Sequence, residues 1–135
     1  KESSGESDET AHSAFWGRHV LLVDDSEINR RFVKDNLIEA GMKVSEAQNG
    51  KIGLEITREQ KPDIILLDIM MPVMDGYAMM DELKEDMEVS DIPVIALTAL
   101  AMKQDVDKVL SLGMNDHIAK PINPNEMFLT ILKWV

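Results

Sequence analysis

Five short apolar runs divide this chain at nearly regular intervals, and they constrain its fold more than any other feature. They lie at residues 20–23, 44–47, 64–67, 94–97 and 118–119. Most of these runs lack the alternation of apolar and polar side chains that a half-buried strand shows, which is typical of strands in a parallel sheet buried on both faces. We therefore expect an α/β protein with one parallel β-sheet.

Segments with the apolar spacing of helices separate these runs. The clearest begins after Ser26, a typical N-cap residue, and ends at Gly41, a typical C-terminal residue. Its apolar side chains are Ile28, Phe32, Val33 and Leu37. The other expected helices span residues 50–59, 77–84, 103–112 and 125–135, and Val106, Val109 and Leu110 should face the core. Strict alternation of strand and helix predicts helices on both faces of the sheet.

Polar side chains occur where four of the predicted strands end. They are Asp24, Asp25, Asp68, Thr98 and Lys120. Taken singly, each has an ordinary explanation, because aspartates cap turns, threonine favours strands and a lysine before proline is often a solvated loop residue. In open α/β sheets, however, ligands bind beyond the carboxyl ends of the strands. The joint placement of these residues on one rim therefore favours a functional site.

The chemistry of this rim follows from its charge. Two carboxylates about 4 Å apart repel by roughly 4 kcal/mol at an effective dielectric constant of 20, so three of them need a cation. Mg²⁺ prefers such oxygen ligands, and Asp24 and Asp25 are adjacent and suited to share it. With Lys120 as a second positive charge, Asp68 can act as the nucleophile toward a phosphoryl group, and Thr98 can donate a hydrogen bond to that group.

Composition limits the other possibilities. The chain has 135 residues, which fits one domain, and it has no cysteine, so disulfides and thiolate metal sites are excluded and a reducing cytosol is a fitting environment. Its net charge of −11 argues against non-specific binding to nucleic acid. No apolar stretch is long enough to span a membrane. We expect residues 1–16 to form an acidic, serine-rich linker before the domain at 17–135. Phe15 and Trp16 either pack against the edge of this domain or belong to a contact between domains, and packing is the favoured interpretation.

A set of short motifs accompanies these rim residues in a fixed order. They are Val23-Asp24-Asp25, Asn49-Gly50, Pro62-Asp63, Met71-Pro72, Asp75-Gly76, Thr98-Ala99, Gly113-Met114 and Lys120-Pro121. On these motifs the chain resembles, over roughly residues 17–135, the receiver domain of two-component response regulators, and particularly the receivers of hybrid sensor histidine kinases. The expected fold is then a doubly wound, flavodoxin-like (βα)5 sheet with strand order 2-1-3-4-5.

The resemblance also implies a function and its residues. Asp68 would accept a phosphoryl group from a phosphohistidine, in a self-catalysed reaction, and pass it on or switch a docking surface. Mg²⁺ would be held by Asp24, Asp25, Asp68 and the carbonyl oxygen of Met70. Thr98 and Lys120 would contact the phosphate, and the Lys120-Pro121 peptide would be cis. The implied partners are a histidine kinase or a histidine phosphotransfer protein, without nucleic acid or direct membrane contact, in the cytoplasm or the cytoplasmic part of a membrane-bound kinase.

Two departures from the family pattern affect the expected switch. His117 stands where receivers usually carry the Tyr or Phe that moves together with Thr98, so it is either a switch residue or a half-exposed strand histidine. Met70 and Leu100 occupy positions that influence how water reaches the phosphate, and as apolar residues they should give it no help. Several methionines follow Asp68, and core filling explains them better than a docking role for Met74.

Two alternative functions use the same residues. Haloacid-dehalogenase-like phosphatases also combine an aspartate nucleophile, Mg²⁺, a Thr or Ser and a Lys, but they usually carry a second aspartate where this chain has Met70. A docking module that keeps the fold without being phosphorylated is the other alternative, and the complete set of rim residues speaks against it.

Overall fold

The structure is a computed structural model that describes residues 14–71, 74–99 and 102–135. Five parallel strands form one sheet in the order β2-β1-β3-β4-β5, and a helix follows each strand along the chain. The strands are β1 (His19–Val23), β2 (Lys43–Ala47), β3 (Ile64–Asp68), β4 (Val94–Thr98) and β5 (Asp116–Ala119). The helices are α2 (Glu27–Glu39), α3 (Gly50–Gln60), α4 (Gly76–Glu85), α5 (Lys103–Ser111) and α6 (Pro124–Leu132). The predicted strand order is confirmed.

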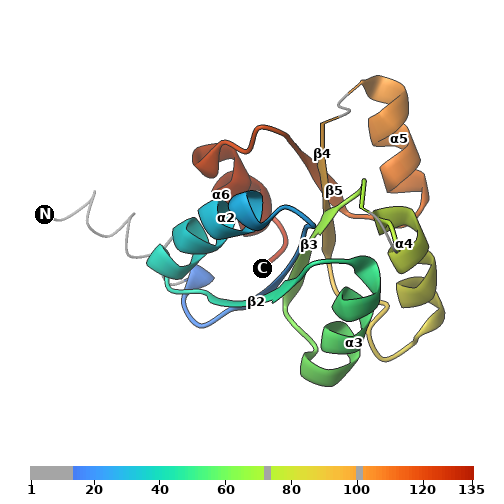
Figure 1. Ribbon diagram of the computed structural model, residues 1–135, viewed down its shortest axis with the longest axis horizontal. Coiled ribbons are helices and arrows are strands. Elements are labelled where there is room, and N and C mark those ends of the chain that lie inside the picture. The colour runs from blue at the N-terminus through green and yellow to red at the C-terminus, as the bar shows by residue number, and fades with distance from the viewer. Residues whose placement is uncertain (1–13, 72–73, 100–101) are drawn as a thin grey trace, which may run out of the picture.

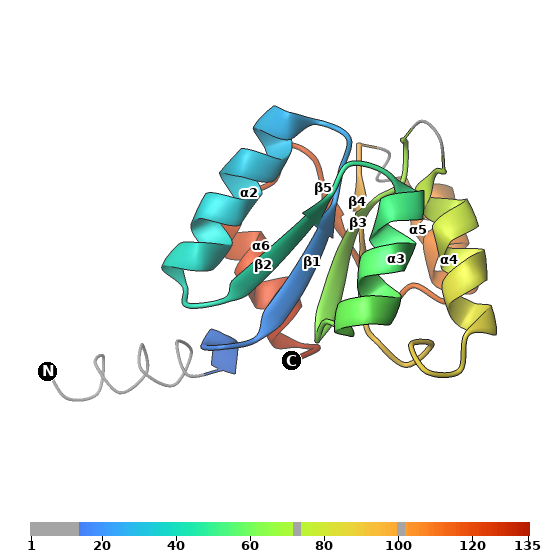
Figure 2. The same cartoon turned by 60° about the horizontal axis from the view of Figure 1, so that its bottom comes forward.

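The helices cover the sheet from both sides, as Figures 1 and 2 show, with α2 and α6 on one face and α3, α4 and α5 on the other. Each face has its own buried apolar cluster, to which the strands contribute alternate residues. All residues of β3 and β4 are buried, whereas β2 and β5, the edge strands, are only partly buried. The continuous apolar runs predicted from the sequence therefore belong to the central strands.

Side chains define where most of the helices begin. Ser26, Asn49, Asp75 and Asn123 each accept a hydrogen bond from a backbone N–H in the first turn of the helix that follows. These caps satisfy donors that the helix itself cannot pair. They explain why the predicted starts agree with the structure to within one residue. The last helix, however, ends at Leu132, three residues before the predicted end.

Three apolar side chains predicted to lie on helix stripes are exposed. Leu110 was expected to face inward, but Val109 occupies that position in α5, and two consecutive residues point about 100° apart on a helix. Ile28 and Phe32 are exposed although their spacing is that of an inner face. The buried residues of α2 are Val33 and Leu37, which lie further along the helix.

The segment before β1 packs against the rest of the fold. Phe15 is buried in the cluster under α6, where its ring lies 5.2 Å from the ring of Phe128. The backbone N–H of Gly17 donates to the carbonyl oxygen of Gly41 at 2.8 Å, which fixes this segment to the turn before β2. The expected packing is thus observed for Phe15, whereas Trp16 is 65% exposed. The expected linker residues 1–13 lie outside the described residues.

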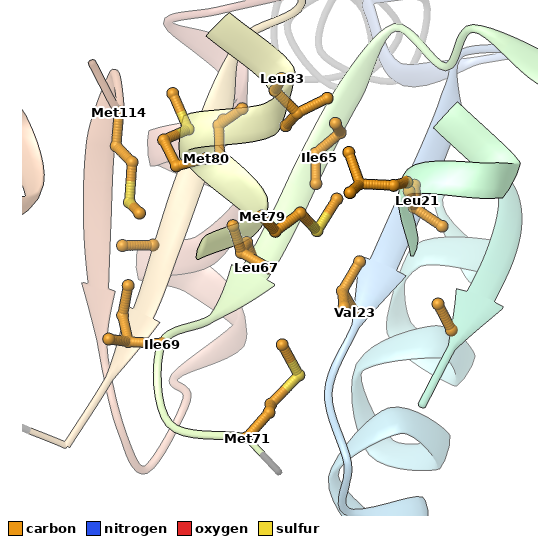
Figure 3. Close-up of a cluster of buried hydrophobic side chains, with 14 of the residues drawn as sticks. Leu21, Val23, Ile65, Leu67, Ile69, Met71, Met79, Met80, Leu83 and Met114 are labelled. Carbon is orange, nitrogen blue, oxygen red and sulfur yellow. The ribbon is translucent and has the colours of Figure 1, made fainter. Parts of the chain in front are cut away.

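Methionines fill much of the core on the side of α3, α4 and α5. Met79 and Met80 of α4 are fully buried, and Met71 and Met114 are nearly so. Figure 3 shows the Met79 side chain reaching from α4 across β3 toward Leu21. Met74 packs against the same cluster. The core-filling interpretation is therefore confirmed for Met71, Met74, Met79 and Met80, whereas Met70 is 66% exposed and does not fill the core. No helix in the described ranges is long and apolar enough to cross a membrane.

We expect Met79→Ala to lower the free energy of unfolding by about 2 to 5 kcal/mol, because it removes a fully buried side chain and leaves a cavity. Chemical denaturation measures this change. Met87→Ala is the matched control, since Met87 is 89% exposed, and it should change stability by no more than about 0.5 kcal/mol. Equal losses for both variants would contradict the packing of α4 described above.

Candidate functional site at the carboxyl rim of the sheet

The predicted site residues meet at the carboxyl end of the sheet. Asp68 and Thr98 are the last residues of the neighbouring strands β3 and β4, and both are buried. Lys120 directly follows β5, and its backbone N–H donates to the carbonyl oxygen of Thr98 at 2.8 Å. The Lys120-Pro121 peptide is cis, as predicted. Because the strands are parallel, their ends bring residues far apart in sequence onto one rim.

Three carboxylates form the acidic part of the rim. Asp24, Asp25 and Asp68 each offer one oxygen, and these oxygens lie within 4.8 Å of one another. Asp24 and Asp68 are buried, whereas Asp25 is exposed. The Nζ atom of Lys120 lies 3.2 Å from Asp68 Oδ2 and 3.5 Å from Asp24 Oδ2. One lysine charge thus serves two buried carboxylates and leaves the cluster with an excess of negative charge.

The two carboxylate oxygens of Asp24 differ in their hydrogen bonding. Its Oδ1 accepts a hydrogen bond from the backbone N–H of Ser26 at 2.9 Å. Within the described part of the chain, its Oδ2 is a buried side-chain oxygen with no hydrogen-bond donor, since Lys120 is close enough for an ion pair but does not form a hydrogen bond. A buried carboxylate oxygen left in this way is costly without a cation. Hard oxygen ligands of this kind fit Mg²⁺.

The same crowding affects the protonation of Asp68. Burial and the nearby charge of Asp24 raise the pKa of Asp68 to about 6, although Lys120 and the backbone N–H of Met70 act in the opposite direction. That N–H donates to Asp68 Oδ1 at 3.2 Å. A divalent cation beside the carboxylates would lower this pKa, because it stabilises the ionised form.

Gly76 explains part of the Asp75-Gly76 motif. A Cβ atom at this position would lie 2.8 Å from the carbonyl oxygen of Asp68 and 2.9 Å from Cα of Ile69, which is closer than real Cβ contacts. The backbone N–H of Gly76 also donates to the carbonyl oxygen of Ile69 at 3.0 Å. Only glycine lets α4 begin so close to the backbone of the predicted nucleophile.

The remaining predicted residues lie around this centre. His117 pairs in register with Ala96, and Ala119 with Thr98, so His117 and Thr98 share one face of the sheet. The His117 side chain is a third exposed, and its Nδ1 lies 3.8 Å from Asp116 Oδ1. The Met70 side chain is exposed on the rim. Pro72 and Leu100 lie outside the described residues.

One contact of this site had no signal in the sequence. Arg30, in the second turn of α2, donates from Nη1 to the backbone carbonyl oxygen of Asp24 at 2.6 Å. An arginine on a helix with helical spacing of apolar residues is ordinarily a solvated surface residue. Only the three-dimensional structure shows that it reaches the acidic loop.

Comparison with known proteins agrees with this geometry. The chain matches the family described as the response regulator receiver domain over residues 20–132. The chain belongs to this family. Among curated relatives, the polar-differentiation response regulator DivK of Brucella anthropi is 36% identical over 118 residues, which cover 87% of this chain and 96% of DivK.

Solved structures of receiver domains have the same fold. The receiver of the sensor histidine kinase PA1611 of Pseudomonas aeruginosa is 33% identical, with a TM-score of 0.81 and coverage of 87% of this chain and 97% of that one. That structure contains a magnesium ion in its active-site cleft. The receiver domain of Ssk1 from Saccharomyces cerevisiae, in complex with the histidine phosphotransfer protein Ypd1, is 25% identical, with a TM-score of 0.84 and coverage of 89% and 90%.

The protein is therefore a receiver domain of two-component signal transduction, with the flavodoxin-like fold predicted from sequence. Receiver domains bind Mg²⁺ in an acidic pocket, and this chain has the corresponding cluster of aspartates. The family assignment favours a receiver over the phosphatase alternative. Its relatives include the receiver of the histidine kinase PA1611. They also include DivK, and the match covers 96% of the DivK chain.

We expect Asp68→Asn to stabilise the protein in EDTA by about 1 to 3 kcal/mol at pH 7.5, because it removes a buried charge whose pKa is raised from 3.8 to about 6. The raised pKa means that folding penalises the ionised form. This penalty is present above about pH 6 and absent below about pH 4, where the carboxyl group is protonated in both states.

Urea denaturation at several pH values measures this difference. The advantage of the variant over the unmodified protein should grow as the pH rises from 4 to 7. Asp81→Asn, at an exposed position of α4, is the control and should show no such trend. If Asp68→Asn is less stable than the unmodified protein at pH 7.5, the ion pair between Asp68 and Lys120 stabilises the fold by more than burial of the Asp68 charge destabilises it.

Proposed function

We propose that Asp68 accepts a phosphoryl group from a phosphohistidine and that the domain relays this group or switches a docking surface with it. The observation that carries the proposal is the buried Asp68 carboxylate, 3.2 Å from Lys120 Nζ and within 4.8 Å of ligand oxygens of Asp24 and Asp25. A nucleophile, a fixed cation and a divalent-ion site are thereby combined at one point. These are the components that phosphoryl transfer to a carboxylate requires.

In this proposal Asp24, Asp25 and Asp68 hold Mg²⁺, together with the Met70 carbonyl oxygen. When bound, the ion neutralises charge on the phosphoryl oxygens and lowers the repulsion between them and the attacking carboxylate. Among the residues that the structure describes, none donates a hydrogen bond to Asp24 Oδ2, which supports its role as a ligand.

In the transfer step the donor supplies the phosphoryl group and Asp68 supplies the attacking oxygen. A carboxylate oxygen of Asp68 forms a bond to phosphorus while the bond between phosphorus and the histidine nitrogen breaks. The electron pair of that bond remains on the imidazole nitrogen, and because the other ring nitrogen of the donor carries a proton, the histidine leaves as a neutral imidazole. Lys120 stays protonated and stabilises the negative charge of the phosphoryl oxygens during transfer.

Thr98 and His117 carry the proposed response. The Thr98 hydroxyl would donate to a phosphoryl oxygen on Asp68, which lies on the adjacent strand. A shift of Thr98 would open space on the sheet face that it shares with His117, and the imidazole would move into it. With apolar Met70 beside the acceptor, we propose that hydrolysis of the acyl phosphate proceeds without assistance from that side chain.

Intact-mass measurement after incubation with acetyl phosphate tests the acceptor. The unmodified protein should gain one phosphoryl group in the presence of Mg²⁺ and none in EDTA. Asp68→Asn should gain none, because the amide is not a nucleophile, whereas Asp81→Asn should be labelled normally. No gain by the unmodified protein, while DivK is labelled in parallel, would favour the docking module that is never phosphorylated.

An apolar surface beside the rim offers a docking place for the phosphohistidine donor. Ile28 is 81% exposed and Phe32 is 47% exposed, both on α2. Phe32 lines a cavity of about 520 Å³, whose other lining residues are Asn29, Val33, Ala99, Lys120, Pro121 and Ile122. Because Lys120 also contacts Asp68, this surface continues directly to the acceptor. Exposed apolar groups of this size are typical of protein interfaces.

We propose that the occupant of this surface is a histidine kinase or a histidine phosphotransfer protein. The structurally similar Ssk1 receiver was solved with a phosphotransfer protein, Ypd1, which supports the class of partner. The partner would place its phosphohistidine over Asp68 and apolar side chains against Ile28 and Phe32. This function places the domain in the cytoplasm or in the cytoplasmic part of a membrane-bound kinase.

A substitution of Ile28 distinguishes binding of the donor protein from the phosphorylation of Asp68 itself. Ile28→Ser should lower the rate of transfer from a phosphorylated phosphotransfer protein by about tenfold or more, as expected for an interface side chain worth over 1 kcal/mol, and leave labelling by acetyl phosphate unchanged. The donor is chosen as one that phosphorylates the unmodified domain. Ile38→Ser, at an exposed position near the other end of α2, is the matched control. Equal rates for Ile28→Ser and the unmodified protein would exclude this surface.

A further inference from the structure

The backbone of Asp24 is held from both sides. Its N–H donates to the carbonyl oxygen of Ala47 on β2 at 3.1 Å. Its carbonyl oxygen accepts the 2.6 Å hydrogen bond from Nη1 of Arg30. With Oδ1 bound to Ser26, only Oδ2 of Asp24 is left to face the carboxylate cluster. The orientation of this one oxygen therefore depends on three neighbours from outside the cluster.

Arg30 is itself fixed rather than solvated. Only 14% of its side chain is exposed, and its Nε donates to Glu46 Oε1 at 3.3 Å. Lys34 donates to the other oxygen of Glu46 at 2.9 Å. The hydrogen bond from Lys34, with a smaller contribution from Arg30, holds the pKa of Glu46 below its usual value, so the carboxylate is ionised at neutral pH. The planar guanidinium thus bridges α2, β2 and the loop after β1.

Glu46 and Ala47 are consecutive residues at the end of β2, so one strand provides both anchors. The carbonyl oxygen of Ala47 accepts a hydrogen bond from the N–H of Asp24. The Glu46 carboxylate accepts one from Arg30, which in turn donates to the carbonyl oxygen of Asp24. An arginine can make both contacts with different nitrogens of one rigid fork, which a lysine cannot do. Groups that orient a metal ligand in this way commonly influence metal affinity by about 10 to 100-fold.

We propose that Arg30 is a positioning residue that orients Asp24 for Mg²⁺ through the Asp24 carbonyl oxygen. The inference rests on the proposed function of this rim, since it concerns the cation that the aspartates would hold. In this role Arg30 acts through the backbone of Asp24 and is not itself a ligand.

A positioning role and a charge effect predict opposite results. Arg30 is positively charged, so through its electric field alone it would weaken the binding of a cation, and its removal would strengthen Mg²⁺ binding. If Arg30 instead orients Asp24, its removal should weaken Mg²⁺ binding. Arg31, the next residue, carries the same charge at an exposed position and provides a matched control for the field.

Isothermal titration calorimetry of the metal-free full chain with MgCl2 tests the proposal without any phosphoryl donor. We expect Arg30→Ala to raise the dissociation constant for Mg²⁺ by about tenfold or more. Arg31→Ala should leave it unchanged or lower it slightly. Labelling of Arg30→Ala by acetyl phosphate should be slow at low Mg²⁺ and recover at saturating Mg²⁺, which a general loss of structure would not produce.

Arg30→Lys keeps the positive charge but lacks the planar guanidinium group. If Arg30→Ala fails to fold, this variant tests whether Arg30 positions Asp24. It should bind Mg²⁺ more weakly than the unmodified protein. The positioning role is wrong if both Arg30 variants bind Mg²⁺ with the same dissociation constant as the unmodified protein. It is also wrong if Arg30→Ala folds and binds Mg²⁺ more tightly than the unmodified protein. Either result would leave the proposed function intact. Absence of Mg²⁺ binding by the unmodified protein would overturn the proposed metal site and this inference together.

Discussion

A negative charge at the end of a strand that is buried on both faces is the constraint on which this structure depends. Asp68 ends β3, where every residue is buried, and its own side chain is 3% exposed. Charge in such a place needs a partner of opposite sign. Lys120 provides one, but Asp24 shares it at a similar distance, so the rim as a whole stays short of positive charge.

The fold holds these carboxylates together against their repulsion. Parallel strands bring their carboxyl ends to one edge, and the hydrogen bonds of the sheet fix the backbone at Asp24 and Asp68. Stability comes from the two apolar clusters beneath, so the rim can remain electrostatically unfavourable until a cation arrives. A receiver domain uses this arrangement because binding and phosphorylation then change the balance of charge at one point of a rigid sheet.

Much of this could be predicted from the sequence, and the errors have clear causes. The central strands were recognisable because both of their faces are buried, and the caps Ser26, Asn49 and Asp75 fixed where helices begin. Leu110 was assigned to the core incorrectly, since helical spacing does not tell which of two adjacent apolar residues meets the sheet. The ring that Phe15 packs against could not be predicted, because Phe128 lies more than a hundred residues away in sequence.

The sequence by itself determined the fold class, the strand order expected of the family and the set of polar residues on the rim. The fold class and the rim residues follow from local patterns, namely apolar runs, caps and the residue at each strand end, whereas the strand order follows from the resemblance to receiver domains. Only the tertiary structure decided that Asp24 Oδ2 is left without a donor, that Gly76 must lie against the Asp68 backbone and that Arg30 reaches the acidic loop. These features depend on distances between separate elements, which packing sets and no local pattern encodes.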